Sequence, residues 1–518
     1  MKREKALVEN VSELATGTRP DDDRCWEALK ARDASFDGLF FVGVSSTGIY
    51  CRAVCSAKTP KRENCTFFGS AAEAEAAGYR PCLKCRPELA PGVPLTPDTH
   101  KAVQNAAERI REGADSGNIS EIASQQGLSD RQLRRLFKST YGVTPSEYRN
   151  TSRLLLAKEL LTDTDLPITR VAYACGFSSV RRFNDSFSRS YSMSPSRFRK
   201  GASSGSGEEG DSIVLHLGYR PPYRFDLLID FLKLRAIPGV EAVDDGVYRR
   251  TVRLDRSGPD EVKSPVSGWI EVADEPGRNR LAVTVSTSLL KELSYVVERV
   301  RRLFDVDCIP GNVEEGLSGF YELVPEENHI AGIRLPSSFN GFEMAVRAIL
   351  GQQVTVKSAS TMAGRLVEEL GEKVSTPHAN LDHTFPSPEV FCKEGIAERL
   401  GELGVIGQRA RAICEIARKM VDGKLTLRPG ANLEMESREL AGVKGVGDWT
   451  VQYLLMRAYG DPDGFPASDL GVKNAFPDMK PREIEKLSRD WSPWRSYAVM
   501  SLWCAPHGGA PSAAKPRG

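Results

Sequence analysis

The chain has no long hydrophobic run. In its 518 residues no apolar stretch approaches the roughly 18–20 residues that a membrane helix needs, so we expect no membrane span and no membrane partner. The first ten residues, MKREKALVEN, are polar and charged, unlike the apolar centre of a signal peptide. Together these two absences predict a cytoplasmic protein.

A strong net charge is also lacking, because 70 Lys and Arg stand against 69 Asp and Glu. The charge is unevenly distributed, since residues 100–200 hold 17 Lys and Arg but only 10 Asp and Glu. A local basic excess fits a surface that contacts nucleic acid, although a merely solvated basic surface would have the same composition. At a typical length of about 150 residues per domain, the chain is expected to form three or four domains.

Cysteine is sparse outside one segment. Five of the 11 cysteines fall within residues 51–85, and in a reducing cytoplasm such a cluster indicates metal binding or catalysis rather than disulfides. Two close pairs, Cys51-x3-Cys55 and Cys82-x2-Cys85, suit a tetrahedral zinc site of four thiolates. A purely structural zinc ion is the simplest interpretation, and the spacing alone does not decide. Cys65 receives no role.

Three ordered motifs of this segment resemble the N-terminal domain of the Ada family of adaptive-response proteins: CWEALKARD (25–33), TGIYCRAVCSAK (47–58) and YRPCLKCRP (79–87). The resemblance implies a small zinc-bound α+β domain with the metal ligands Cys51, Cys55, Cys82 and Cys85. It also implies that Cys51 accepts the methyl group of a DNA methyl phosphotriester. The DNA contacts implied by the family are Thr47, Lys58 and Arg80.

The chemistry implied for Cys51 agrees with the properties of a zinc-bound thiolate. Zinc keeps a cysteine deprotonated at neutral pH, and the thiolate is the nucleophile. Four thiolates on Zn²⁺ leave the centre doubly negative, and conversion of one sulfur to a thioether leaves it singly negative. Repulsion from the DNA backbone then falls, so methylation is expected to tighten DNA binding and to act as a switch.

Residues 100–200 contain two copies of a helix-turn-helix pattern, at 119–140 and 168–190. Gly127 and Gly176 make the turns, and the copies end alike, as YGVTPSEYR and YSMSPSRFR. The tandem resembles the AraC/XylS family of DNA-binding domains. This implies an all-α domain that binds promoter DNA with two recognition helices and activates transcription with RNA polymerase as a partner. A helical scaffold with basic solvent faces is the alternative. The expected DNA-contacting side chains are Arg131, Arg134, Arg135, Arg181 and Arg182.

The C-terminal half begins after a Gly/Ser-rich linker at 201–211. Its first part mixes strand and helix patterns, and its second part predicts helices joined by Gly and Pro turns. Gly445 and Gly447 form a Gly-x-Gly hairpin between helices, where the backbone can approach a phosphate closely. About twenty residues later Asp469 opens a helix, a position at which helix capping is the ordinary role of an aspartate.

The combination of hairpin and aspartate resembles the helix-hairpin-helix superfamily of DNA glycosylases. Three further motifs are similar to the AlkA family of 3-methyladenine DNA glycosylases: YRPPYRFDLLIDFLKLRAI (219–237), FEMAVRAILGQQVTV (342–356) and WSPWRSYAVMSLW (491–503). The resemblance covers about 212–507 and implies a TATA-box-protein-like α+β domain followed by an all-α glycosylase core.

The AlkA resemblance carries the role of catalytic carboxylate to Asp469. It carries a base pocket to the aromatic residues Phe231, Trp449, Tyr453 and Trp503, although such residues often belong to the core. Trp449 stands where bifunctional relatives have a catalytic lysine, so we expect hydrolysis of the N-glycosidic bond without strand cleavage. Gln353 stands at the position of the residue that is inserted into the duplex, where the best-known relative has leucine.

The sequence thus predicts a fusion that acts on alkylated double-stranded DNA as methyl acceptor, transcriptional regulator and 3-methyladenine-type glycosylase. A regulator with a catalytically inactive glycosylase-like module is the alternative. No Pro-Cys-His-Arg motif is present, so repair of O-alkylated guanine is not expected. The expected boundaries are 1–90 for the zinc domain, 100–200 for the helix-turn-helix domain, 201–211 for the linker, 212–330 for the α+β domain, 331–507 for the glycosylase core and 508–518 for a tail.

Overall fold

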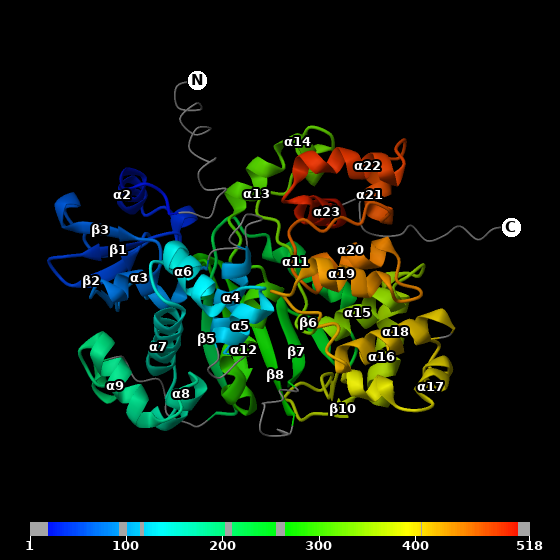
Figure 1. Cartoon of the computed structure of the whole chain (residues 1–518), viewed down its shortest axis with the longest axis horizontal. Coiled ribbons are helices and arrows are strands. Elements are labelled where there is room, and N and C mark those ends of the chain that lie inside the picture. Colours follow the sequence, from blue (N-terminus) through cyan, green and yellow to red (C-terminus); the bar gives the residue numbers. More distant parts are fainter. Residues whose placement is uncertain are drawn as a thin grey trace. The chain divides into compact units, whose positions relative to one another are not determined.

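The computed structural model describes residues 19–92, 101–113, 119–201, 210–254, 265–405 and 407–505. Most of the linker expected at 201–211 and all of the tail expected at 508–518 lie outside these residues. The chain divides into two compact units. Figure 1 labels helices and strands of the chain. No helix of the described part is long and apolar enough to cross a membrane. The described residues of unit one fall within 1–221, 274–301 and 306–312, and those of unit two within 222–273, 302–305 and 313–518.

Unit one begins with a helix and a small four-stranded sheet of order β3-β1-β2-β4. The helix starts after Asp21, whose carboxylate accepts the backbone N–H of Arg24 at 2.8 Å. Strand β4 runs parallel to β2, whereas β1 pairs antiparallel with both β2 and β3. The elements are α2 (Asp22–Ala31), η2 (Ala34–Phe36), β1 (Phe41–Val44), β2 (Ile49–Arg52), η3 (Arg62–Asn64), β3 (Cys65–Phe68), α3 (Ala71–Ala76), β4 (Arg80–Pro81) and η4 (Pro87–Leu89).

Seven helices follow in unit one and form the predicted tandem of helix-turn-helix copies. Ser129 caps the second helix of the first copy in a capping box with Gln132, and Ser179 caps the corresponding helix of the second copy. The long helix α7 joins the two copies. The helices are α4 (Lys101–Arg111), α5 (Ile119–Gln125), α6 (Asp130–Tyr141), α7 (Pro145–Asp163), α8 (Ile168–Ala174), α9 (Val180–Tyr191) and α10 (Pro195–Gly201).

The last part of unit one is a pair of antiparallel strands with alternating burial. Ile213, Leu215 and Leu217 of β5 are buried, as are Leu281, Val283 and Val285 of β9. The elements are β5 (Ser212–Gly218), η5 (Pro276–Arg278), β9 (Arg280–Ser286), η6 (Thr287–Glu292) and most of α12 (Leu293–Leu303).

Unit two contains helix α11, whose buried side chains include Leu228 and Leu232, and three antiparallel strands that pair in the order β6-β7-β8. Short helices follow the strands. The elements are α11 (Phe225–Arg235), β6 (Glu241–Asp244), β7 (Val247–Leu254), most of β8 (Val266–Glu275), part of α13 (Pro310–Gly316), α14 (Ser318–Tyr321) and η7 (Glu326–Asn328).

The rest of unit two is a helical core around α15, which packs against α16, α18 and α20. Helix α15 buries eight of its ten residues, and seven of these are apolar; the eighth is Glu343, which pairs with Arg250 and Arg347. The small β10–β11 pair was not expected from the sequence. The elements are α15 (Gly341–Leu350), α16 (Val356–Leu370), β10 (Glu372–Lys373), β11 (His383–Thr384), η8 (Pro388–Cys392), α17 (Ile396–Glu402), α18 (Gln408–Val421), α19 (Leu433–Ala441), α20 (Asp448–Arg457), α21 (Leu470–Ala475), α22 (Pro481–Leu487), η9 (Ser488–Trp491) and α23 (Arg495–Cys504).

Candidate functional sites

The two cysteine pairs meet because strands β2 and β4 lie side by side. Cys51 belongs to β2 and Cys55 to the turn after it, while Cys82 and Cys85 belong to the turn after β4. The parallel register pairs Tyr50 with Pro81 and so brings both turns to the same end of the sheet. The four sulfur atoms all lie within 4.8 Å of one another.

This sulfur cluster fits a zinc ion. Zinc–thiolate bonds of about 2.3 Å in a tetrahedron require sulfur atoms about 3.8 Å apart, which the cluster allows. The backbone N–H of Lys84 donates to Sγ of Cys82, and that of Arg52 donates to Sγ of Cys85, each at 3.4 Å. Cys51, Cys55, Cys82 and Cys85 therefore form a Zn²⁺ site.

The four ligands differ in accessibility. Cys51 and Cys85 are partly exposed, whereas Cys55 and Cys82 are buried. A partly exposed thiolate can reach an external electrophile, so Cys51 has the access that an acceptor requires.

The expected DNA contacts around the zinc site are spread over three segments. Thr47 is exposed in the turn between β1 and β2, and its hydroxyl donates to the carbonyl of Val44 at 3.2 Å. Arg80 is half-buried on β4, opposite Ile49 in the register. Lys58 is exposed after the Cys55 turn. All three residues belong to the zinc-binding domain.

Arg52 supports the zinc site and was not anticipated from the sequence. Its Nε donates to Oδ1 of buried Asp37 at 2.9 Å, and its Nη1 donates to the carbonyl of Cys85 at 3.1 Å. The side chain thereby holds the Cys82–Cys85 turn against β2. Its place directly after Cys51 was the only signal in the sequence.

The segment after Cys85 is fastened to helix α7 by ion pairs. Both terminal nitrogens of Arg86 donate to the carboxylate of Asp163, at 2.8 and 2.5 Å. Lys158 pairs with Glu88, and each of these side chains is only 1% exposed. The zinc-bound segment and α7 are therefore joined within unit one by charges that are largely shielded from water.

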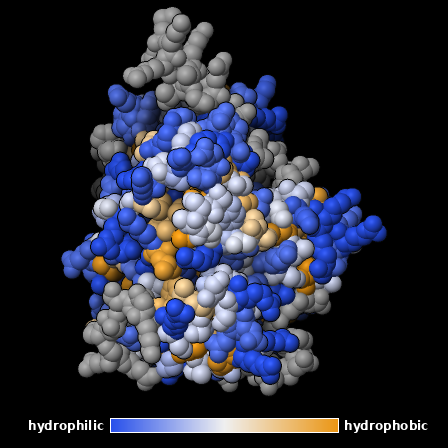
Figure 2. Space-filling model, turned by 90° about the vertical axis from the view of Figure 1, so that its left-hand side faces the viewer, coloured by the Kyte–Doolittle hydropathy of each residue, from blue (hydrophilic) through white to orange (hydrophobic). Residues whose placement is uncertain are grey.

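The two recognition helices present their arginines to solvent. Arg131, Arg134 and Arg135 on α6 and Arg181 and Arg182 on α9 are all exposed. The opposite faces bury Leu133 and Phe137 on α6, and Phe183 and Phe187 on α9. The face seen in Figure 2, which includes the side where α9 lies in Figure 1, is mainly hydrophilic with small separate hydrophobic areas. These helices have the exposed basic face that contact with DNA requires.

In unit two, Asp469 lies between two tryptophan side chains. Its Oδ2 accepts Nε1–H of Trp449 at 3.0 Å, and its Oδ1 accepts Nε1–H of Trp503 at 2.9 Å. Oδ1 also accepts the N–H of Gly471 at 2.8 Å, so Asp469 caps α21 as well. The capping role and a fixed, half-exposed carboxylate therefore coexist.

The four aromatic residues expected to form a base pocket lie together. Trp449 stacks on Tyr453 at 5.1 Å between ring centroids, and Tyr453 lies 6.0 Å from Trp503. Phe231 stacks on Trp503 at 6.0 Å with an angle of 14° between the rings. Three of these rings are partly exposed, but Phe231 is buried.

Two arginines near Phe231 were missed by the sequence analysis. The guanidinium carbon of Arg235 lies 3.7 Å from the centroid of the Phe231 ring, and that of Arg457 lies 4.7 Å from it. Burial lowers the pKa of Arg457 to about 10. Phe231 is thus covered by cations and a tryptophan, which favours a supporting role over direct stacking on a base.

The Gly445–Gly447 hairpin and the turn that carries Gln353 each contain a residue with positive φ. Gly445 has a φ of +101°, which favours glycine, and its carbonyl accepts Nε2–H of Gln352 at 2.9 Å. Gly447 has open space where a side chain would stand. Gln353 is exposed in the turn between α15 and α16, and its φ of +55° places it in the left-handed region.

Four family models match the chain and cover most of it. They are the metal binding domain of Ada (residues 24–88), a helix-turn-helix domain (122–201), the AlkA N-terminal domain (214–340) and the HhH-GPD superfamily of base excision DNA repair proteins (346–486).

Among curated proteins, the chain is similar to the "Probable bifunctional transcriptional activator/DNA repair enzyme AlkA" of Mycobacterium tuberculosis. The two are 35% identical over 491 residues, which cover 93% of this chain and 96% of the relative. "DNA-3-methyladenine glycosylase 2" of Escherichia coli is 30% identical over 287 residues, 55% of this chain and 95% of that protein. "Bifunctional transcriptional activator/DNA repair enzyme Ada" of Escherichia coli is 35% identical over 182 residues, 35% of this chain and 49% of that protein.

Proposed function

Because the chain belongs to the family of bifunctional transcriptional activator/DNA repair enzymes that unite Ada-type and AlkA-type modules, we propose that it performs two separate repair reactions on alkylated DNA. It binds zinc and DNA. The first reaction is methyl transfer to Cys51, which also switches transcription. The second is excision of alkylated bases at Asp469.

The methyl transfer uses the partly exposed sulfur of Cys51. This sulfur attacks the methyl carbon of a DNA methyl phosphotriester; the S–C bond forms, the O–C bond breaks, and its electron pair stays on the phosphate oxygen. Bound zinc keeps the four thiolates deprotonated and nucleophilic. The half-buried Arg80 and the exposed Thr47 and Lys58 would hold the flanking DNA backbone.

The observation that carries this proposal is the approach of four sulfurs to within 4.8 Å with Cys51 partly exposed. Because a thioether is a poor leaving group, each protein molecule should react once. Incubation with DNA that carries methyl phosphotriesters should give one methyl group per chain, mapped by mass spectrometry to Cys51. Methylation of another cysteine, or turnover beyond one equivalent, would contradict the proposal.

Methylation of Cys51 would reduce the negative charge of the zinc centre and so raise affinity for DNA. The helix-turn-helix copies would then bind promoter DNA and present the protein to RNA polymerase. Affinity for a promoter duplex should therefore be higher after methylation than before, at matched salt. Equal affinities would remove the switch while leaving the methyl transfer itself intact.

The second reaction is hydrolysis of the N-glycosidic bond of alkylated purines such as 3-methyladenine. Alkylation on a ring nitrogen makes the base a good leaving group, so no general acid is required. The target nucleotide leaves the stack, with Gln353 filling the gap, and its base enters the aromatic group formed by Trp449, Tyr453 and Trp503.

The carboxylate of Asp469 stabilises the positive charge that develops on the sugar as the bond to the base breaks. Water then adds to the sugar carbon and leaves an abasic site with both strands intact. The observation that carries this step is the carboxylate held by two indole N–H groups beside stacked aromatic rings.

Asp469→Asn separates the catalytic role from the capping role. Asparagine caps a helix about as well as aspartate, so the fold should persist. The charge is lost, and with the amide oxygen at the capping position the amide nitrogen cannot accept the N–H of Trp449. Release of 3-methyladenine should therefore fall by roughly 10²–10³-fold or more, while binding to an abasic-site analogue persists. Methyl transfer to Cys51 serves as the internal control. Near-normal base release would favour a regulator with an inactive glycosylase-like module.

A further inference from the structure

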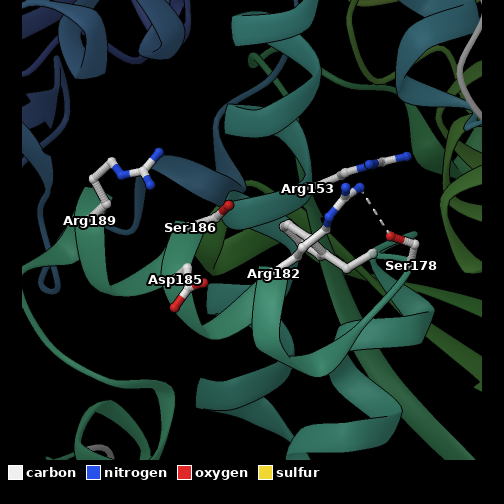
Figure 3. A pocket seen from close by; sticks show the side chains of 7 residues that line it. Arg153, Ser178, Arg182, Asp185, Ser186 and Arg189 are labelled. Carbon is white, nitrogen blue, oxygen red and sulfur yellow. Dashed lines mark hydrogen bonds between the residues drawn. The ribbon is translucent and has the colours of Figure 1, made fainter.

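A hollow of about 360 Å³ lies beside the recognition helix of the second helix-turn-helix copy (Figure 3). It is strongly cationic, because three arginines line it and only one carboxylate does. Its lining includes Arg153 from α7, Phe177 and Ser178 from the turn before α9, and Arg182, Asp185 and Arg189 from α9.

Arg153 is the unexpected member of this set. It belongs to the joining helix α7, yet its guanidinium lies 5.8 Å from the centroid of the Phe177 ring in the turn before α9. Burial and the nearby Arg149 lower the pKa of Arg153. A partly buried guanidinium beside two exposed ones makes this hollow attractive to an anion, because the single carboxylate of Asp185 offsets only part of the charge.

Glycine at position 176 makes room for this arginine. A side-chain Cβ at Gly176 would lie 3.3 Å from Nε and Nη2 of Arg153, closer than most real contacts of that atom. Gly127, the corresponding turn residue of the first copy, has open space around it. Both glycines have the left-handed φ that the turn requires, +75° and +70°. Only the second turn is therefore also shaped around an arginine.

The two copies differ again on their recognition helices. When the helices are aligned on their capping residues, Ser129 and Ser179, Arg182 stands where the first copy has Gln132. The Gln132 side chain turns back to accept the backbone N–H of Ser129 at 2.9 Å. Arg182 instead donates to Ser178 Oγ at 3.5 Å, at the rim of the hollow (Figure 3). At this position the second copy thus has a cationic side chain, whereas the first copy has a neutral side chain that bonds to its own helix cap.

We propose that Arg153 and Arg182 together bind one backbone phosphate of DNA in this hollow, with Arg189 adding a further positive charge. Planar guanidinium groups suit the oxygen atoms of a phosphate, and two of them can neutralise it from different helices. The second copy is thereby anchored to the DNA backbone in a way that the first is not. This inference rests on the proposed DNA binding of the helix-turn-helix domain.

The test measures how affinity depends on salt, with the full chain and a duplex that the full chain selects from a random-sequence pool. Arg153→Ala should weaken binding about three- to tenfold and make the slope of log K against log salt less steep by about one, since one phosphate contact is lost. The loss should be equal on a scrambled duplex, because a phosphate carries no sequence information.

Two comparisons separate the possible failures. Arg149→Ala removes a charge one turn earlier on α7, outside the lining of the hollow. Because Arg149 acts on Arg153 only through its charge, this variant should change the slope less than Arg153→Ala does. Arg181→Ala tests the domain itself, since it removes an exposed arginine of the recognition helix. If Arg181→Ala weakens binding and Arg153→Ala does not, the phosphate site is wrong. If neither does, the proposed DNA binding of this domain fails instead.

The glycine pair provides a matched control for backbone strain. Gly176→Ala and Gly127→Ala impose similar strain in their turns, but only the first displaces Arg153. Gly176→Ala should shift the Arg153 guanidinium by a few tenths of an ångström, so it should change the salt slope in the same direction as Arg153→Ala but by less. It should add nothing in the double variant with Arg153→Ala, and Gly127→Ala should not change the slope. Circular dichroism verifies that each variant is folded. An equal slope change in both glycine variants would overturn the assignment.

A free anion is the other possible occupant of the hollow. If the site binds a phosphate of the DNA backbone, inorganic phosphate should compete with DNA better than chloride does at the same ionic strength, and this difference should disappear in Arg153→Ala. Phosphate that binds at Arg153 without weakening DNA binding would overturn this assignment and identify a separate site for a free anion.

Discussion

The indole Nε1 of Trp503 donates a hydrogen bond of 2.9 Å to Oδ1 of Asp469. Trp449, on helix α20, donates a hydrogen bond to the other oxygen of the same carboxylate. Each oxygen of Asp469 therefore accepts one indole N–H, and the two bonds fix the orientation of the carboxylate. A carboxylate that must stabilise charge in a transition state benefits from such orientation before the reaction. The aromatic side chains therefore position Asp469 as well as line the site.

Trp503→Phe tests this positioning role, because it keeps an aromatic ring and deletes the N–H. One hydrogen bond to a charged group is lost, so kcat for release of 3-methyladenine should fall about tenfold or more with little change in KM. Trp494→Phe is the control. Trp494 is buried at the N-cap of α23, the helix that carries Trp503, but it lies outside the hydrogen bonds to Asp469 described above. Equal rates for Trp503→Phe and the wild type would contradict the role.

Cys82→Ala should abolish zinc binding and unfold the zinc domain, because the binding free energy of a structural zinc ion is also folding free energy. Zinc released on denaturation should fall from one equivalent to none. Cys65→Ala is the control. Cys65 is buried on β3 outside the sulfur cluster, so the Cys65→Ala protein should still bind one equivalent of zinc. A zinc-free Cys82→Ala protein with a folded zinc domain would refute the structural part of the assignment.

Lys158→Met should destabilise unit one by about 3–5 kcal/mol, because it removes the buried cation beside the Glu88 carboxylate and leaves only the partly exposed Arg86. The double variant Lys158→Met/Glu88→Gln removes both charges and should recover most of this loss. Urea unfolding measures both effects. A double variant no more stable than Lys158→Met would show that packing, not charge, explains the loss.

Glu159 should make stability depend on pH. Burial raises its pKa to about 8, from an ordinary value of 4.5, so the folded chain holds this proton more tightly than the unfolded chain. Its contribution to the free energy of unfolding is complete below pH 4.5 and is lost as the pH rises through about 8.

Glu159→Gln should remove that pH dependence. In the wild type the backbone N–H of His216 donates to Oε1 of Glu159 at 2.8 Å, and the glutamine side chain keeps an oxygen that can accept this bond. The variant should gain stability relative to the wild type between about pH 5 and about pH 8, as measured by urea midpoints. Glu121→Gln, on the exposed face of α5, should leave both curves unchanged. Parallel curves for Glu159→Gln and the wild type would contradict the prediction.

The zinc site was predictable because its ligands come in two short, ordered motifs. The spacing of Cys51, Cys55, Cys82 and Cys85 indicated a four-thiolate centre, and only the pairing of β2 with β4 was needed to assemble it. The duplicated helix-turn-helix pattern was predictable for a similar reason, since capping residues, turn glycines and helical periodicity are local properties.

The geometry around Asp469 was not predictable in the same way. Trp449, Asp469 and Trp503 come from three helices of unit two, and nothing local in the sequence states that both indoles donate to one carboxylate. The resemblance to the AlkA family identified these residues as a group. The hydrogen bonds between them depend on how α20, α21 and α23 pack.

By itself the sequence determined the order of the modules, the metal ligands and the recognition helices, because each is written in contiguous residues with a characteristic spacing. Only the tertiary structure decided which distant charges meet: Arg86 with Asp163, Lys158 with Glu88, and Arg153 with the turn at Gly176. The physical reason is that an ion pair or an unpaired cation depends on side-chain packing and exclusion of water. Those properties arise only when segments far apart along the chain come into contact.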